Sequence, residues 1–232
     1  GPTTHYVMGG VKVDGDSQMS TVPGLFAAGE VAAGLHGATR LGGNSLSDLL
    51  VFGKIAGEYA AKFAKENSAG RLDEQQIQFA ARAALEPLER QASGGGENAY
   101  QIQYDLQDMM QLYAGIVRHH KDLTIAAEKL QDLKKRAARV SVPGNREYNP
   151  GWHTAMDLAN LLTVSEALVL SGLDRKESRG GPSREDHPEK KDDHARHNAV
   201  IRRDPRNGQM QMLRVPIPPM REELKKVVEE NK

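Results

Sequence analysis

Residues 22–46 read VPGLFAAGEVAAGLHGATRLGGNSL and set the order of elements in the first part of the chain. The apolar segment 24–29 follows a Pro-Gly turn and predicts a short buried strand. A glycine-rich loop over residues 34–43 comes next, and a helix is expected over about residues 45–65. This order favours nucleotide binding, because loop amides and a helix N-terminus attract negative charge.

The start of that helix carries a second signal. Ser45 and Asp48 have the spacing of a capping box, which would hold the first amide groups of the helix. The nucleotide signal is weak by itself, since the sequence contains neither GxGxxG nor the phosphate-binding pattern GxxxxGK followed by Ser or Thr.

The composition excludes several classes of function. Lys+Arg and Asp+Glu number 31 each among 232 residues, so no net positive charge draws the chain to nucleic acid or to an anionic membrane. The absence of cysteine excludes disulfides and any iron–sulfur cluster held by this chain's thiolates. We expect no signal peptide, and no apolar run that approaches the roughly 20 residues of a membrane-spanning helix.

Apolar residues recur every three or four positions through residues 71–174 and predict an antiparallel helical bundle. We expect three long helices plus a further one after Trp152, with turns at residues 93–96 and 143–144. Pro87 is expected to end or kink its helix near Glu86. The stripe residues are Ile102, Leu106, Met109, Tyr113, Ile116, Leu123, Ala126, Leu130, Leu133, Ala137, Val140, Leu158, Leu161, Ser165, Leu168 and Gly172.

The last part of the chain, residues 175–232, is polar and rich in proline. Charges crowd residues 175–197, which predicts a solvated face. The Asn207-Gly208 dipeptide between two apolar-alternating segments favours a β-hairpin, and residues 220–232 are expected to form a surface helix. Three histidines among the acids match no metal-binding spacing, so we predict no metal site; they are His187, His194 and His197.

Three residues of the first part are candidates for chemistry: His5, Glu30 and Arg40. Each also has an ordinary structural explanation. A loop histidine is usually a surface residue, a glutamate after a strand can be solvated, and an arginine among glycines can pair with a structural carboxylate. The order in which the three occur, with their neighbours, carries the functional hypothesis.

This ordered set resembles the succinate dehydrogenase and fumarate reductase flavoprotein subunits, and the similarity covers nearly the whole chain. The first matching stretches are PTTHYVMGGV at residues 2–11, VPGLFAAGE at 22–30 and HGATRLGGNSL at 36–46. Further on, the matching stretches are NPGWH at residues 149–153, RKESRG at 175–180 and REDHP at 184–188.

The resemblance implies a role for each residue of the motifs. His5 and Arg40 would bind the two carboxylates of succinate or fumarate, and a guanidinium suits this task because it makes two parallel charged hydrogen bonds. FAD would be the cofactor, with Glu30 on its sugar-like part. His36 is interpreted as a structural neighbour. The expected cofactor-binding residues are Tyr6, Glu30, Arg40, Asn44, Ser45 and Leu46.

The sequence departs from the family pattern at two places. Thr39 stands where the family usually has Asn, and Gly181-Pro182 stands where a His is common. The family's GxGxxG fold, its flavin-linking His and its proton-shuttling Arg all precede the Thr-His-Tyr motif. We therefore expect this chain to be the C-terminal portion of a larger flavoprotein, with an unknown proton donor outside it, and inactive by itself.

The implied fold class is α+β. Residues 1–66 would be the C-terminal part of an FAD-binding α/β domain, residues 71–174 an antiparallel three-helix bundle, and residues 175–232 a polar C-terminal segment with a small β-hairpin. The implied partners are an iron–sulfur subunit and, indirectly, membrane anchor subunits, with no nucleic acid. The implied location is the cytoplasmic, inner face of the cell membrane.

Two other functions stay open on the sequence. L-aspartate oxidases share the His and Arg motifs and use FAD, although the stretch at residues 149–153 is closer to the dehydrogenases. A non-catalytic helical scaffold is the second alternative, and it would leave His5 and Arg40 without a purpose.

Overall fold

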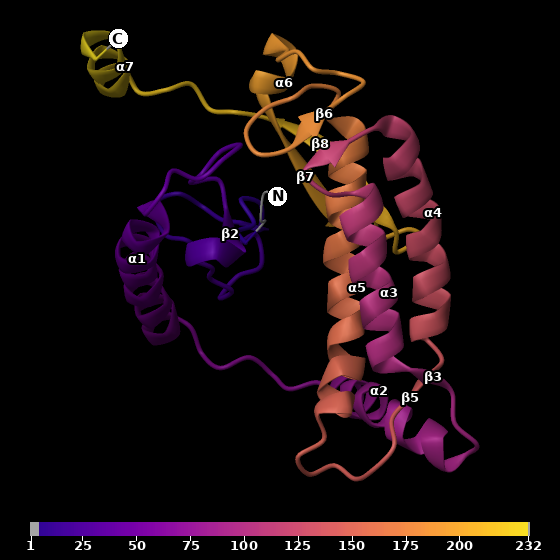
Figure 1. The fold of residues 1–232 in the computed structure, drawn as a ribbon. Helices are drawn as coiled ribbons and strands as arrows, with labels where there is room; N and C mark the ends of the chain where they lie inside the picture. Colours follow the sequence, from indigo (N-terminus) through magenta and orange to yellow (C-terminus); the bar gives the residue numbers. More distant parts are fainter. Residues whose placement is uncertain (1–4, 232) are drawn as a thin grey trace.

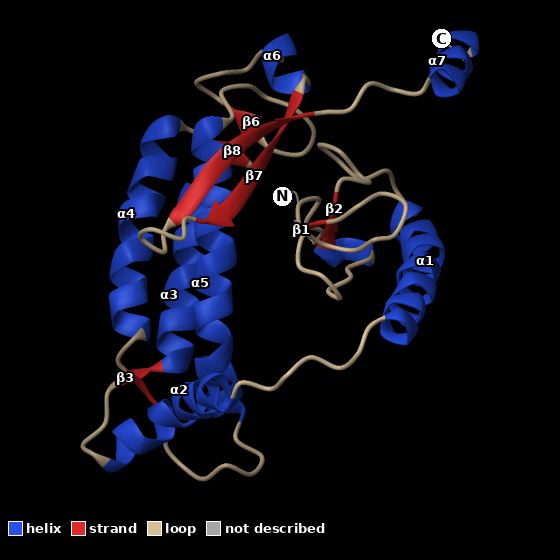
Figure 2. Ribbon diagram, turned by 180° about the vertical axis from the view of Figure 1, so that it is seen from behind, coloured by secondary structure: helices blue, strands red, loops and turns tan. Residues whose placement is uncertain are grey.

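The computed structural model describes residues 5–231, so residues 1–4, including the Thr of the Thr-His-Tyr motif, and Lys232 lie outside the described part. Figure 1 shows a small N-terminal body beside a tall helical body. The two are joined by a loop over residues 67–73, which Figure 2 shows from behind. The expected mixture of helices with small sheets is confirmed.

The N-terminal body is built on one long helix and very short strands. β1 (Val11–Lys12) pairs in parallel with β2 (Ala32–Ala33), and the 3-10 helix η1 (Gly29–Val31) precedes β2. The predicted strand over residues 24–29 is wrong, because only Phe26 forms an isolated bridge there. Gly24 has a φ of 83° and Gly29 a φ of 75°. These left-handed conformations turn the chain away from an extended path.

Helix α1 (Asn44–Glu66) begins without the predicted capping box. Its N-cap is Gly43, with a φ of 80° and no side-chain cap hydrogen bond. Asp48 is buried and pairs with His36 instead, which removes its carboxylate from the helix end. The first turn of α1 is therefore open toward the glycine-rich loop.

The second body consists of α2 (Glu74–Ala92), α3 (Ala99–Tyr113), α4 (His120–Ala137) and α5 (Pro150–Asp174). α3, α4 and α5 lie side by side, and α2 crosses their base (Figure 1). Asx caps begin three of these helices, at Asp73, Asn98 and Asn149. The buried core contains many residues of the predicted stripes, but Leu162 and Val169 are buried on α5 where Leu161, which is exposed, was predicted. The core residues are Ala99, Ile102, Leu106, Met109, Ala114, Leu123, Ala126, Leu130, Leu133, Val140, Val142, Leu158, Leu162 and Val169.

Two pairs of short parallel strands tie the ends of the helices together. At the base, β3 (Glu97–Asn98) pairs with β5 (Val140–Ser141). At the other end, β4 (Val117–Arg118) pairs with β6 (Ser183–Arg184), so the polar C-terminal segment is joined to the loop between α3 and α4.

Pro87 does not end its helix, since α2 continues to Ala92. The indole Nε1 of Trp152 donates to the carbonyl of Ala84 at 2.6 Å, one turn before the proline. Pro87 cannot donate to the carbonyl of Ala83, four residues earlier, and the indole binds the neighbouring carbonyl instead. The tryptophan also attaches α2 to the start of α5.

Helix α5 is long and apolar enough, by length and composition, to cross a membrane, so the expectation that no such run exists is wrong. α5 is also the helix that both α3 and α4 contact. Leu158, Leu162 and Val169 are buried in that contact. Packing in the bundle therefore accounts for part of its apolar composition.

The C-terminal segment forms α6 (Asp192–Ala195), β7 (His197–Arg203), β8 (Met210–Pro216) and α7 (Glu222–Glu230). β7 and β8 pair antiparallel, which confirms the hairpin predicted from Asn207-Gly208. α7 is exposed along its length, as expected for a surface helix. The prediction of a solvated face over residues 175–197 is wrong in part, since Glu177 and Arg184 are buried.

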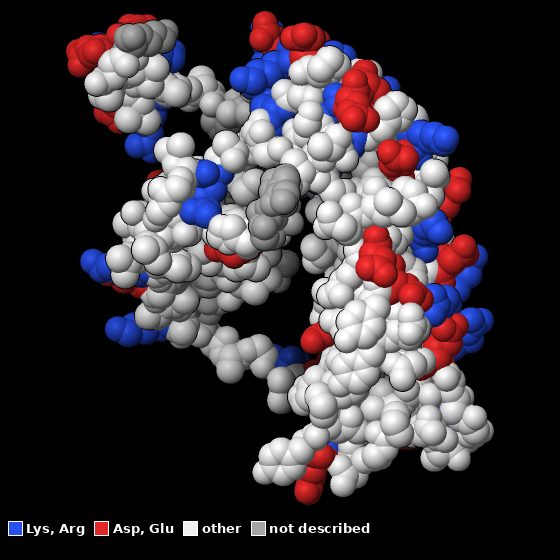
Figure 3. Space-filling view, viewed as in Figure 1, with Lys and Arg blue, Asp and Glu red and all other residues white. Residues whose placement is uncertain are grey.

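Charge is distributed unevenly over the helical body. Figure 3 shows Lys, Arg, Asp and Glu side chains mixed along the edge formed by α4. Ion pairs there join different elements, such as Arg136 with Asp105 at 2.6 Å and Lys134 with Glu166 at 2.5 Å. These ion pairs connect α4 with α3 and α5 at the surface of the bundle.

Candidate functional site

The structure brings His5 and Arg40 together. Nη2 of Arg40 lies 3.1 Å from Nε2 of His5, across 35 positions in the sequence. His5 is exposed and Arg40 is half-buried, so their polar ends are open to a ligand. Arg40 donates in this contact and Nε2 of His5 accepts, because a guanidinium has no acceptor. The other guanidinium N–H groups favour an anion, because they can donate to carboxylate oxygens.

Arg40 is held by its neighbours without a carboxylate partner among the described residues. Its guanidinium carbon lies 4.5 Å from the centre of the Tyr6 ring, and its Nη1 lies 3.5 Å from the Oγ of Ser45. Its Nε is buried with no hydrogen-bond partner within the described part of the chain. A buried donor without a partner is costly, so this atom indicates that a ligand or a further polar group belongs at the site.

Beneath Arg40 lies a buried polar triangle. The Tyr6 hydroxyl is 3.1 Å from Nε2 of His36, and this nitrogen is 3.3 Å from Oδ2 of Asp48. Burial, followed by the negative charges of Asp48 and Glu30, raises the pKa of the Tyr6 hydroxyl above its ordinary value. Tyr6 therefore stays neutral and presents its ring face to the guanidinium of Arg40.

Glu30 lies within η1 rather than at the end of a strand. Its Oε1 accepts a hydrogen bond from the backbone amide of Val7 at 2.9 Å. The carboxylate thus fixes the segment that carries His5 and Tyr6. The side chain is exposed, so it also has an open side toward solvent.

Asn44, Ser45 and Leu46 form the first turn of α1, and Leu46 is 67% exposed. Cβ atoms added at Gly42 or Gly43 would meet nothing within 4 Å, so the space before the helix is open. An uncapped helix N-terminus and the Arg40 guanidinium both supply positive potential there. These residues fit an anionic edge of a flavin or a dicarboxylate.

Sequence reasoning missed the role of Asp48, which it interpreted as a cap, and left His36 as a neighbour only. The signal that points to Asp48 is a carboxylate on the side of α1 that faces the loop, where burial requires a partner.

Of the histidines in the C-terminal segment, His194 and His197 have ring centres 5.5 Å apart. Among residues 5–231, no group of three or more His, Asp or Glu is placed to hold a metal ion.

Comparison with known proteins places these features in one family. A model described as FAD binding domain matches residues 1–46, which contain His5 and Arg40. A model described as fumarate reductase flavoprotein C-term matches residues 103–228. Together they define a flavoprotein. The chain belongs to the succinate dehydrogenase and fumarate reductase flavoprotein family.

Relatives from several organisms are similar over most of the chain. The fumarate reductase flavoprotein subunit of Mycobacterium tuberculosis is 38% identical over 209 residues, which cover 88% of this chain and 36% of the relative. The succinate dehydrogenase flavoprotein subunit of Bacillus subtilis is 34% identical over 196 residues, which cover 83% and 33%. The chain thus spans about a third of the length of these relatives.

Solved structures agree with this assignment. The apo Sdh1 complex of Mycobacterium smegmatis has a chain with a TM-score of 0.89 and 42% identity, covering 95% of this chain and 37% of that one. A quinol-fumarate reductase structure with menaquinol molecules gives a TM-score of 0.82 and 31% identity, covering 94% and 38%. FAD is the cofactor of this family.

Proposed function

We propose that this chain forms the dicarboxylate-holding part of an FAD-dependent oxidoreductase that interconverts succinate and fumarate. The observation that carries the proposal is the approach of Arg40 to His5 at 3.1 Å, while no carboxylate of residues 5–231 pairs with Arg40. The names of the relatives support the reaction class. The whole reaction belongs to the longer protein of which this chain corresponds to about a third.

Each residue has a distinct task. Arg40 binds one carboxylate through its planar fork and His5 binds the other, so their 3.1 Å contact opens when a dicarboxylate enters with its central carbons between them. Tyr6 supports the guanidinium from below and stays neutral. FAD, when bound, supplies the hydride acceptor or donor. The catalytic proton donor is assigned to no residue of this chain.

The cofactor lies against the open end of α1 in this proposal. Asn44, Ser45 and Leu46 line it, and the helix dipole stabilises negative charge there by about 1 kcal/mol. Glu30 binds the sugar-like part with the side of its carboxylate that Val7 does not use. Arg40 contacts both the cofactor and the substrate.

In this proposal the electrons leave through an iron–sulfur subunit, as the family resemblance implies. In the same proposal the complex lies at the cytoplasmic face of the cell membrane, bound through anchor subunits. The naming of similar proteins as flavoprotein subunits supports an assembly of several chains.

The test uses the flavin-loaded, full-length protein. We expect Arg40→Gln and His5→Gln each to lower kcat/KM for fumarate, calculated per bound flavin, by about 100-fold or more. Arg71→Gln, in the exposed linker, is the matched control and leaves kcat/KM unchanged. Full activity of the Arg40→Gln protein would disprove the assignment.

A further inference from the structure

Glu177 lies at the centre of a buried cluster of hydrogen bonds just after α5. Its side chain has no exposed area, although it is charged. Oε1 accepts from Nη1 of Arg175 at 2.6 Å and from Nε of Arg179 at 2.8 Å. Oε2 accepts from Nη2 of Arg179 at 3.0 Å and from the backbone amide of Lys191 at 2.8 Å. This many charge-assisted bonds fix the conformation of the segment around Arg179.

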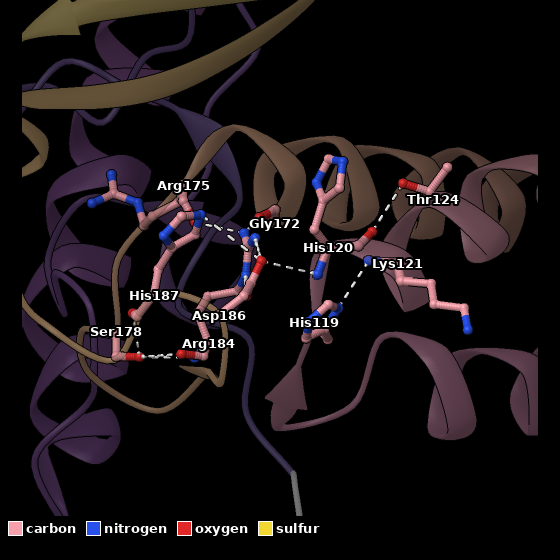
Figure 4. Close-up of polar contacts among 10 residues, drawn as sticks. All are labelled: His119, His120, Lys121, Thr124, Gly172, Arg175, Ser178, Arg184, Asp186 and His187. Atoms are coloured by element: carbon pink, nitrogen blue, oxygen red, sulfur yellow. Dashed lines mark hydrogen bonds and ion pairs between the residues drawn. The ribbon is translucent and has the colours of Figure 1, made fainter.

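A second buried group anchors the same segment to the helical body. Nη1 of Arg184 donates to the carbonyl of Gly172 at 2.7 Å, and its other nitrogens pair with Asp186 at 2.7 and 2.8 Å. Oδ2 of Asp186 then accepts from the backbone amide of His120 at 3.2 Å. Figure 4 shows this chain of contacts from the end of α5 to the start of α4.

Between these two anchors, the turn at Gly180 touches the loop that carries Arg40. Gly180 has a φ of +74°, and a Cβ added there would overlap the carbonyl oxygen of Ala38 and lie 2.5 Å from its carbon. The amide of Gly181 donates to that same carbonyl at 3.3 Å. The backbones of the two bodies therefore meet here at a distance that only glycine permits.

We propose that Gly180 is a positioning residue for substrate binding, through which the anchored turn 179–181 holds the loop at Ala38 and so places Arg40 against His5. The proposal rests on the function proposed above. Ala38 is two residues before Arg40, so a shift of its carbonyl moves the guanidinium. A displacement of about 1 Å at a substrate-binding group is sufficient to reduce a reaction by about 100-fold.

A matched pair of glycines makes the proposal testable. Gly180→Ala forces the Ala38 carbonyl to move, whereas Gly181→Ala meets only the Cε of Met8 at 3.8 Å, an ordinary contact. In the flavin-loaded, full-length protein we would measure malonate binding by calorimetry, together with KM and kcat for fumarate. Malonate is a dicarboxylate without the reacting carbon pair, so its binding reports the site apart from turnover.

We expect Gly180→Ala to weaken malonate binding by about tenfold or more and to raise KM for fumarate, with flavin content kept. Gly181→Ala should stay within twofold of the parent on each measure. Malonate binding within twofold of the parent in a flavin-loaded Gly180→Ala protein would overturn the proposal. If the parent itself binds no malonate, the proposed function fails instead, and the two failures are distinct.

A second variant covers the case in which Gly180→Ala does not load flavin. Glu177→Gln keeps the size of the side chain and leaves both glycines in place, but it weakens the hydrogen bonds from Arg179 that hold the turn. We expect it to weaken malonate binding by about fivefold, and an unchanged value would overturn the proposal.

Discussion

Nε2 of His36 lies 3.3 Å from Oδ2 of Asp48, and each side chain is only 4% exposed. The same nitrogen is 3.1 Å from the Tyr6 hydroxyl. A buried carboxylate is costly unless it is hydrogen-bonded, so Asp48 is held in place by these partners and holds them in turn. Through Tyr6, this group supports the guanidinium of Arg40 from the protein side.

The first prediction concerns the ionisation of Tyr6. Replacing Asp48→Asn removes a negative charge that raises the pKa of the Tyr6 hydroxyl, so that pKa should fall toward its ordinary value. The fall is partial, because burial, which contributes most to the shift, remains. The measurement is phenolate absorbance against pH on this chain, with a Tyr6→Phe protein subtracted to isolate the one tyrosine.

The control is Glu58→Gln on the same helix, where the carboxylate is exposed and paired only with Lys54 at 3.6 Å. It should leave the titration of Tyr6 unchanged. An equal shift in both variants would mean that a general change of charge, rather than contact with Asp48, sets the pKa of Tyr6.

The second prediction tests the core of the helical body. Leu130 is fully buried between the helices, so Leu130→Ala should lower the free energy of unfolding by about 2–5 kcal/mol. Leu112, which is 69% exposed on α3, offers the same change without a cavity. Leu112→Ala should stay within about 0.5 kcal/mol of the parent in urea unfolding. Equal losses would contradict the packing described.

The third prediction concerns the junction of α2 with α5. Trp152→Phe keeps an aromatic ring but removes the hydrogen bond from Nε1 to the Ala84 carbonyl. The free energy of unfolding should fall by about 1 kcal/mol, measured by circular dichroism in urea. Tyr148→Phe, in the exposed loop before α5, is the control and should change nothing.

The helical part of the fold was predictable because its signal is local. The spacing of Ile102, Leu106 and Met109 repeats with the helical period, and all three are buried. The hairpin was predictable for the same reason, since Asn207-Gly208 defines a turn by itself. The strand over residues 24–29 was not, because a short apolar run becomes a strand only when neighbouring strands pair with it.

The site was predictable only where family resemblance supplied long-range information. Periodicity does not relate His5 to Arg40, which lie 35 positions apart, but the matched motifs do. Asp48 and Glu177 were misinterpreted for a common reason. Charged residues usually lie at the surface. A single sequence does not show that Asp48 has a buried histidine as its partner, or that Glu177 has two arginines.

The last prediction follows from the charge buried in Glu177. Burial alone opposes its ionisation, but hydrogen bonds from Arg179, the Lys191 amide and Arg175 outweigh it and lower the pKa from 4.5 to about 2. A carboxylate whose pKa is lower in the folded state stabilises the fold above its ordinary pKa. That contribution is lost as the pH falls from about 4.5 through about 2.

Glu177→Gln should therefore be less stable than the parent by about 3 kcal/mol at neutral pH, because Arg179 loses its charged partner. The difference should narrow steadily below pH 4.5, since the parent carboxylate is then protonated as well. The measurement is the free energy of unfolding of both proteins at pH 7, 4.5 and 2.5, taken as a difference so that other acidic groups cancel. Glu185→Gln, an exposed acid nearby, should show no such trend. A difference that stays constant with pH would mean that Glu177 stabilises the turn by its shape and not by its charge.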